Sequence, residues 1–187
     1  MQEIVFEQFQ QVGEDLFRLG LITSHGGNMS IRHQGKLLIT AHFTMLGRLE
    51  PGDLVDIPLR EEPDHVTSDA SKDIGLHQLI YKFTSAGAVI HTHPAHAVAL
   101  SLSRDMITPL DLEGTALLRE IPVIDASEAE SQAPQLLQTH VAAMVRGHGC
   151  YVVGRTLVEA LAYTTALARS TEISWLSEPH GPITPSS

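Results

Sequence analysis

The first segment of the chain mixes apolar and polar residues with the period of an amphipathic helix. Apolar side chains recur at spacings of four and three residues, so they would share one face of a helix. Gly20 follows, a residue type that often ends helices. The pattern therefore predicts an N-terminal helix with one buried face, made by Val5, Phe9, Val12, Leu16 and Leu19.

Shorter apolar runs between turn residues predict a series of short strands. The first follows a glycine-rich turn, His25-Gly26-Gly27-Asn28, and another follows the turn Pro51-Gly52-Asp53. The predicted strands are 29–32, its hairpin partner 36–40, then 54–57, 88–93, 121–124 and 148–153.

Helical patterns alternate with these strands. Ser71 is a candidate N-cap for a helix with Leu76, Leu79, Ile80 and Phe83 on one side, and Pro94 suits the first turn of a helix that carries Val98 and Leu102. Residues 132–145 are predicted to be helical, and Thr156-Leu157-Val158-Glu159 is a capping box that opens a last helix to about Leu176. This order predicts a layered α/β protein with helices on both faces of a largely antiparallel sheet.

Composition narrows the class of protein. The 187 residues suit one domain, with 43% hydrophobic and 18% charged residues, and we expect residues 1–177 to form it and 178–187 to be a flexible tail. A net charge of -10 argues against nucleic acid as a partner. The single cysteine, Cys150, favours a reducing compartment, and we find neither a signal peptide nor a membrane span. We therefore expect a cytoplasmic protein.

The candidate chemistry lies in His91-Thr92-His93 at the end of an apolar strand. Residues i and i+2 of a strand point to the same face, and Pro94 favours an extended His93, so both imidazoles should converge. His148, flanked by two glycines, is the best third ligand for a zinc-like divalent ion.

Other interpretations remain open at this point. His91 and His93 could simply form hydrogen bonds at a strand end. His77 and His96 are weaker candidate ligands, more typical of supporting or surface positions, and a lone cysteine on an apolar strand, such as Cys150, usually serves packing.

Four motifs, in this order and spacing, resemble the class II aldolase and adducin family, in particular its fuculose-phosphate aldolases. They are Gly27-Asn28-Met29-Ser30-Ile31-Arg32, Ser71-Lys72-Asp73 followed by His77, His91-Thr92-His93-Pro94, and Gly147-His148-Gly149. The resemblance implies a three-layer α/β/α sandwich and a homotetramer with sites at subunit interfaces. It also implies Zn²⁺, or Mn²⁺, Fe²⁺ or Co²⁺, bound by His91, His93 and His148, with Gly27, Asn28, Ser71 and Lys72 as substrate contacts.

The resemblance further implies a lyase that cleaves or forms a C–C bond in a small sugar phosphate or related hydroxy-carbonyl compound. The reaction would pass through a metal-stabilised enediolate. The family's acidic base falls on Asp73, near a helix N-terminus that favours a carboxylate, although an acid at a helix start is also common without any catalytic role. An epimerase or dehydratase on the same scaffold is the alternative, and a non-catalytic scaffold of the adducin kind is a further one.

The chain departs from the family's pattern around the substrate. Asp73 replaces the usual Glu, Ala41-His42-Phe43 replaces a phosphate-binding Thr-Gly pair, and Ser71-Lys72 replaces a Ser-Ser pair. No tyrosine lies between Tyr81 and Tyr151 to serve as the aldolases' proton donor, so Asp111 and Glu113 are the candidates for that role.

Overall fold

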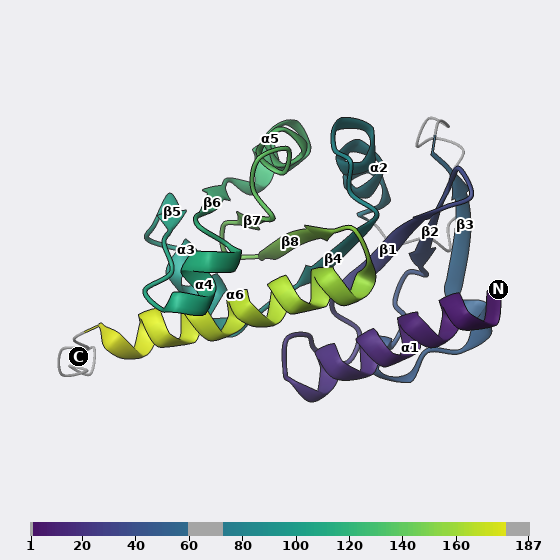
Figure 1. The fold of residues 1–187 in the computed structure, drawn as a ribbon, viewed down its shortest axis with the longest axis horizontal. Helices are drawn as coiled ribbons and strands as arrows, with labels where there is room; N and C mark the ends of the chain where they lie inside the picture. The colour runs from purple at the N-terminus through teal and green to yellow at the C-terminus, as the bar shows by residue number, and fades with distance from the viewer. Residues whose placement is uncertain (1, 60–72, 179–187) are drawn as a thin grey trace, which may run out of the picture.

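The computed structural model describes residues 2–59 and 73–178, which form alternating strands and helices (Figure 1). In chain order, the elements are α1 (Gln2–Arg18), β1 (Asn28–His33), β2 (Lys36–Thr40), η1 (Leu46–Arg48), η2 (Pro51–Asp53), β3 (Leu54–Pro58), α2 (Ile74–Phe83), β4 (Ala88–Thr92), α3 (Ala95–Ser101), β5 (Met106–Ile107), α4 (Leu112–Leu117), β6 (Ile121–Ile124), η4 (Ala126–Glu128), α5 (Ala129–Leu136), β7 (Ala142–Val145), β8 (Gly149–Gly154) and α6 (Leu157–Ser177).

The strands form one mixed sheet in the order β3-β2-β1-β4-β8-β7-β6-β5. β4 lies between β1 and β8 and is antiparallel to both. β6 and β7 instead run in parallel, because α5 connects them and returns the chain to the same end of the sheet. The sequence-based expectation of a largely antiparallel sheet is therefore corrected to a mixed sheet.

Helices cover both faces of this sheet, with α2 and α5 on one side and α1 and α6 on the other (Figure 1). The strand β4 serves both layers. Val89 packs into the core beneath α2 and α5, whereas Ala88 and Ile90 pack into the core with α1 and α6. Side chains two residues apart share a strand face, so His91 lies on the same side as Val89, toward α2.

The predicted N-terminal helix is present and buries the expected face, with one exception. Phe9, Val12 and Leu16 are buried, but Leu19 is 58% exposed because the helix has already ended at Arg18. Gly20 follows in the left-handed region (φ +68°), which a glycine adopts without the steric cost of a side chain.

The prediction of a single helix over 132–145 is wrong. The helix α5 ends at Leu136, and Ala142–Val145 form the buried strand β7. β7 pairs with β6 on one side and β8 on the other, so the sheet satisfies its backbone groups. A short apolar run carries no periodicity that separates a buried strand from a helix.

The sequence predicts helix starts at Ser71 and at Thr156. Ser71 lies outside the described residues, and α2 begins after Asp73. Thr156 does cap α6, because its side chain accepts a hydrogen bond from the Glu159 N–H. The carboxylate of Glu159 accepts from the N–H of Arg155, so only the threonine half of the predicted capping box is present.

The described part of the chain ends at Glu178, just after α6. Glu178, where the predicted tail begins, forms an ion pair with Arg104, and the rest of that tail lies outside the described residues. Within 2–59 and 73–178, no helix combines the length and apolar character that a membrane span requires.

Candidate metal centre

Three histidines meet at the end of the sheet where the central strand β4 ends and its neighbour β8 begins. His91 belongs to β4, His93 follows two residues later, and His148 directly precedes β8. The potential ligand atoms of the three side chains all lie within 4.8 Å of one another, and the Nε2 atoms of His91 and His93 are 3.0 Å apart. The structure thus brings together the three histidines that the sequence selects.

The chemistry and spacing of these nitrogens fit a divalent metal. In a tetrahedral zinc site, nitrogens at about 2.0–2.1 Å from the ion lie about 3.3 Å from each other. The N–H at Nδ1 of His91 donates to the carbonyl of Cys150 at 3.0 Å. This hydrogen bond fixes the tautomer, so the Nε2 lone pair of His91 points toward the other two rings, as a metal ligand requires.

Two glycines allow the backbone to approach these rings. A Cβ atom at Gly149 would lie 2.4 Å from Cδ2 of His93 and 3.0 Å from Cε1 of His91, so any side chain would displace the imidazoles. Gly27 adopts φ +78°, and a Cβ there would lie 2.8 Å from the carbonyl oxygen of His91. The predicted substrate contact Gly27 therefore has a structural requirement of its own.

Strand register aligns two further polar residues with His91. Asn28 in β1 pairs with His91 on one side, and Tyr151 in β8 pairs with it on the other. The Tyr151 ring stacks on the His91 ring, with centroids 4.2 Å apart and planes 13° apart. Paired residues of neighbouring strands point to the same face, so Asn28, His91 and Tyr151 form a row beneath the start of α2.

Asp73 lies above this row. Its Oδ2 atom is 3.8 Å from Nε2 of His91 and accepts a hydrogen bond from Nδ2 of Asn28 at 2.6 Å. Burial raises the pKa of the Tyr151 hydroxyl, and the Asp73 carboxylate raises it further, so the two side chains interact. A partly exposed carboxylate is thus held beside the histidine cluster by residues from two neighbouring strands.

Burial and charge tune the protonation states at this site. Burial opposes the charged forms, and it lowers the pKa of His91 to about 3 against the attraction of Asp73. Burial also lowers the pKa of His93, with a smaller effect from His148 in the same direction. For Asp73, burial alone would raise the pKa, but His91 and the Asn28 hydrogen bond outweigh it, and the pKa is lowered. Neutral imidazoles and an ionised carboxylate suit metal binding and proton acceptance.

A fourth histidine, His77, lies one helical turn beyond Asp73 along α2. His77 is fully buried, and its Nδ1 atom is 2.7 Å from the hydroxyl of Ser30, which lies 3.0 Å from the hydroxyl of Tyr81. Burial lowers the pKa of His77 to about 4, with Asp73 opposing the shift. The predicted supporting position of His77 agrees with this placement, since its ring packs edge-on against Tyr151 and not among the three histidines.

The turn that carries His148 is anchored by Arg146. The Arg146 guanidinium donates to the carbonyls of Ser101 and Arg104 and to the carboxylates of Asp105 and Asp125. The N–H of Gly147 donates to the Ser101 hydroxyl at 2.9 Å. Arg146, Ser101 and Tyr151 are functional candidates that sequence reasoning missed. The buried Tyr151 is hidden in an apolar strand, and only the register with His91 reveals it.

The remaining sequence candidates lie elsewhere. Cys150 is buried with its thiol 3.3 Å from the Thr92 hydroxyl, and burial raises its pKa to about 11, as expected of a packing residue. His96 packs against Trp175. Asp111 caps α4 by accepting from the N–H of Gly114, and Glu113 lines a separate cavity with His96. Ser71 and Lys72 fall outside the described residues.

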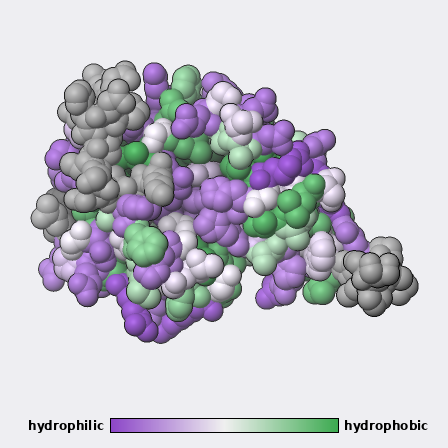
Figure 2. Space-filling view, turned by 180° about the vertical axis from the view of Figure 1, so that it is seen from behind, coloured by the Kyte–Doolittle hydropathy of each residue, from purple (hydrophilic) through white to green (hydrophobic). Residues whose placement is uncertain are grey.

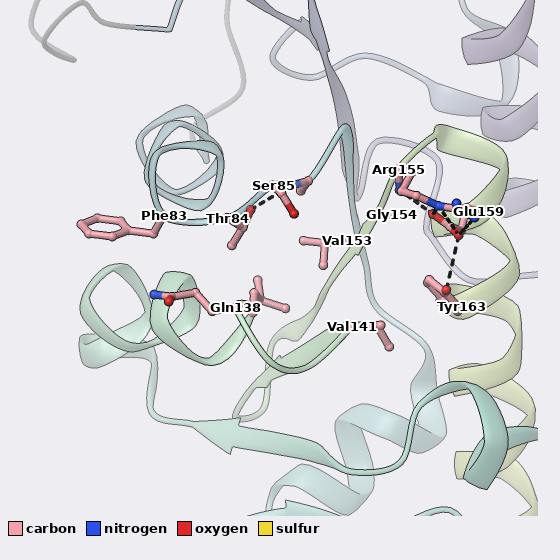
Figure 3. Close-up of a pocket in the computed structure, with 12 residues that line it drawn as sticks. Phe83, Thr84, Ser85, Gln138, Val141, Val153, Gly154, Arg155, Glu159 and Tyr163 are labelled. Atoms are coloured by element: carbon pink, nitrogen blue, oxygen red, sulfur yellow. Dashed lines mark hydrogen bonds and ion pairs between the residues drawn. The ribbon is translucent and has the colours of Figure 1, made fainter.

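A cavity of about 440 Å³ lies at the opposite end of β8 from the histidines (Figure 3). Ser85, Gln138 and Val153 contribute to its lining. Its charged groups already have partners, because Glu159 binds Arg155 through several hydrogen bonds. The candidate chemistry of the described residues is therefore concentrated at the histidine cluster.

The fold and the site define an α/β protein with a candidate metal centre and an adjacent carboxylate. The sequence profile of the class II aldolase and adducin N-terminal domain matches residues 7–175, so the chain belongs to this family.

Individual relatives carry several names. The solved structure of L-fuculose-1-phosphate aldolase from Thermus thermophilus is 38% identical, with a TM-score of 0.87 over 95% of this chain and 97% of that one. L-fuculose phosphate aldolase from Methanocaldococcus jannaschii is 25% identical, covering 91% of this chain and 96% of its own length. Methylthioribulose-1-phosphate dehydratase from Gluconobacter oxydans is 30% identical, covering 83% of each.

Proposed function

We propose that the protein is a divalent-metal-dependent lyase of the aldolase type, acting on a small sugar phosphate or a related hydroxy-carbonyl compound. One observation carries the proposal: the Asp73 carboxylate lies 3.8 Å from a nitrogen of a three-histidine cluster. A proton acceptor beside a Lewis-acid site is the arrangement needed to form an enediolate from a bound carbonyl compound.

The roles of the residues follow from their contacts. His91, His93 and His148 would hold Zn²⁺ or a similar ion, which supplies Lewis-acid polarisation of a carbonyl when bound. Asp73 accepts the proton or returns it, since its lowered pKa keeps it ionised near neutral pH. Asn28 holds the carboxylate in place through a hydrogen bond, and Tyr151 interacts with it from the neighbouring strand.

The similarity to two proteins named fuculose-phosphate aldolases supports the aldolase assignment. The 30% identity to a protein named methylthioribulose-1-phosphate dehydratase supports a second candidate, a sugar-phosphate dehydratase. An aldolase working in the direction of condensation and a dehydratase both remove a proton next to a carbonyl, and aldol cleavage returns a proton to the same carbon, so the same Asp73 and histidines would serve either enzyme. A non-catalytic scaffold would not need Asp73 beside the cluster.

A substrate panel tests the proposal. The purified protein, loaded with Zn²⁺, Mn²⁺, Fe²⁺ or Co²⁺, is incubated with ketose phosphates, and the products are resolved by mass spectrometry. An aldolase yields two smaller carbonyl compounds, whereas a dehydratase yields a product lighter by one water. We expect fuculose 1-phosphate itself to react poorly, because Ala41-His42-Phe43 stands where the resembling aldolases carry a Thr-Gly pair. Absence of any metal-dependent product with every substrate would contradict the proposal.

We further propose that the protein is a cytoplasmic homotetramer with its sites at subunit interfaces. Large apolar side chains are exposed along the segment from α3 to α4, namely Leu102, Leu110 and Leu112, which is 92% exposed. Figure 2 shows one face of the molecule, on which hydrophobic residues (green) also gather toward the end of the molecule where the chain's C-terminus lies. A Cβ atom at Gly147 would lie 3.2 Å from Leu102, so this apolar segment adjoins the turn that carries His148. Contact between subunits here would place a neighbour beside the metal centre.

A further inference from the structure

Two aromatic residues form an exposed stack near the histidine cluster. The rings of His25 and Phe43 have centroids 4.5 Å apart and planes tilted by 26°. Phe43 is 71% exposed and adopts φ +62°, in the left-handed region that bulky residues rarely occupy. An exposed aromatic ring in a disfavoured backbone conformation is a feature that clusters at ligand sites.

The stack borders the same sheet edge as the metal centre. His25 precedes Gly26, where a Cβ atom would lie only 3.3 Å from Nδ1 of His93. Phe43 follows β2, whose last residue, Thr40, accepts a hydrogen bond from the N–H of Met29 in β1, and the neighbouring Asn28 pairs with His91. Neighbouring strands are about 4.8 Å apart, so the end of β2, from which the chain continues to Phe43, lies two strands or about 10 Å across the sheet from β4.

The chemistry of the His25–Phe43 stack differs from that of a phosphate-binding site. A phosphate is bound by converging backbone N–H groups, hydroxyls and cationic side chains. Here the stack offers two flat ring faces, and the Ser24 hydroxyl, 3.0 Å from Nδ1 of His25, holds the imidazole in position. Flat rings of this kind bind apolar or aromatic groups by stacking.

We infer that His25 and Phe43 are specificity-determining residues that bind an apolar or aromatic tail of the substrate, two strands away from the metal centre. The inference rests on the proposed function, since it assigns the substrate class of that site. A small molecule is favoured over a second protein chain as the occupant, because the loop that carries His25 runs so close to the His93 ring that a side chain at Gly26 would meet it.

Hydroxamates test this without a known substrate, because they chelate divalent metals through two oxygens whether or not the protein turns over. Isothermal titration calorimetry on the zinc-loaded protein compares acetohydroxamate, which has no tail, with 3-phenylpropionohydroxamate and phosphoglycolohydroxamate. The phenylpropionyl chain is long enough to approach the stack. We expect it to bind about tenfold more tightly than acetohydroxamate, the gain typical of one buried aromatic contact.

Variants assign that gain to the stack. Phe43→Ala and His25→Ala should abolish the tenfold gain while leaving the Kd of acetohydroxamate unchanged. Phe83→Ala removes another exposed phenylalanine, at the cavity beyond the far end of β4, and should change neither value.

Each other outcome overturns the inference. Equal binding of the phenyl and acetyl compounds, or a phenyl gain that survives in Phe43→Ala, shows that no tail site exists here. A gain confined to phosphoglycolohydroxamate shows an anion site instead. If Phe43→Ala lowers the mass in light scattering without altering the phenyl gain, Phe43 is a self-association contact. If acetohydroxamate itself fails to bind, the metal centre fails, and the tail site with it.

Discussion

Oδ2 of Asp73 lies 3.8 Å from Nε2 of His91, so the start of α2 and the end of β4 bring a carboxylate close to a candidate metal ligand. The two residues lie on either side of α2 in the sequence and are joined through Asn28. Asn28 both pairs with His91 in the sheet and donates a hydrogen bond to Asp73. Asn28 therefore connects the acid to the ligand, through its register with His91 and its hydrogen bond to Asp73.

We expect one divalent ion per chain in the purified protein, held by the three histidines. Elemental analysis of His93→Ala should find less than a tenth of the metal of the parent protein at the same free metal concentration, because loss of one of three ligands removes a large part of the affinity. His96→Ala, which removes a histidine three residues further along, should retain the full metal content. Full metal occupancy in His93→Ala would refute the assignment.

Arg146 should support metal binding without touching the metal. Its guanidinium ties the end of β7 to the end of α3 and so fixes the turn that carries His148. Arg146→Ala is expected to weaken the Kd for Zn²⁺ by about tenfold, the low end of the range for groups that support metal ligands.

A matched arginine serves as the control for this experiment. Arg155 forms an ion pair with Glu159 at the other end of β8, and Arg155→Ala should leave zinc affinity unchanged in a chelator competition assay. An equal loss in both variants would mean that Arg146 acts through general stability and not through His148.

The sequence was most informative where chemistry and local period coincide. His91 and His93 are two residues apart at the end of β4, and the period of an extended chain predicts their convergence. Tyr151 was missed because its partner lies 60 residues away, and the pairing with His91 depends on the order β1-β4-β8, which no local pattern encodes. For the same reason β7 was mistaken for helix: its four buried residues gain strand geometry only from β6 and β8 on either side.

Stability should fall on acidification, partly through His77. In the folded protein burial lowers the pKa of His77 to about 4, whereas an exposed histidine of the unfolded chain titrates near its ordinary value of about 6.5. As the pH falls through 6.5, the unfolded chain takes up the proton first, so the free energy of unfolding decreases until the pH reaches the folded pKa. His77 alone should account for about 2 kcal/mol between pH 7 and pH 5.

Urea denaturation at the two pH values measures this contribution. His77→Gln should remove about 2 kcal/mol of the pH dependence, whatever its effect on stability at pH 7. His42→Gln, which replaces an exposed histidine, should leave the pH dependence as it is. An unchanged pH dependence in His77→Gln would show that His77 titrates normally in the folded protein.

The proposed homotetramer should depend on the apolar segment between α3 and α4. Leu112→Glu places a charge on the most exposed apolar side chain of this segment, and burying that charge at an interface is costly. Light scattering at micromolar concentration should show a tetramer for the parent protein and a smaller species for Leu112→Glu. Val158→Glu, an exposed apolar position at the start of α6, should remain tetrameric. A monomeric parent protein would contradict the proposal.

The last prediction is that Asp73 acts as the general base. The lowered pKa of its carboxyl favours the ionised form, and the Asn28 hydrogen bond holds it beside the histidine cluster. Asp73→Asn keeps the shape of the side chain but removes the proton acceptor. We expect it to retain fold, metal and oligomeric state while kcat falls by about 10²–10⁴, the range usual for lost acid–base catalysis.

Proton exchange at the carbon next to a bound ketone, followed by NMR in deuterated water, measures this step even before the true substrate is known. Asp73→Glu, which lengthens the arm by one methylene and restores the residue usual in the resembling aldolases, should retain part of the exchange rate. Asp111→Asn is the matched control, since Asp111 caps α4 through the Gly114 N–H, and its exchange rate should equal that of the parent protein. If Asp73→Asn exchanged the proton as fast as the parent, the base would be another group. Glu113 would then be tested next, since Asp111→Asn is already part of the comparison.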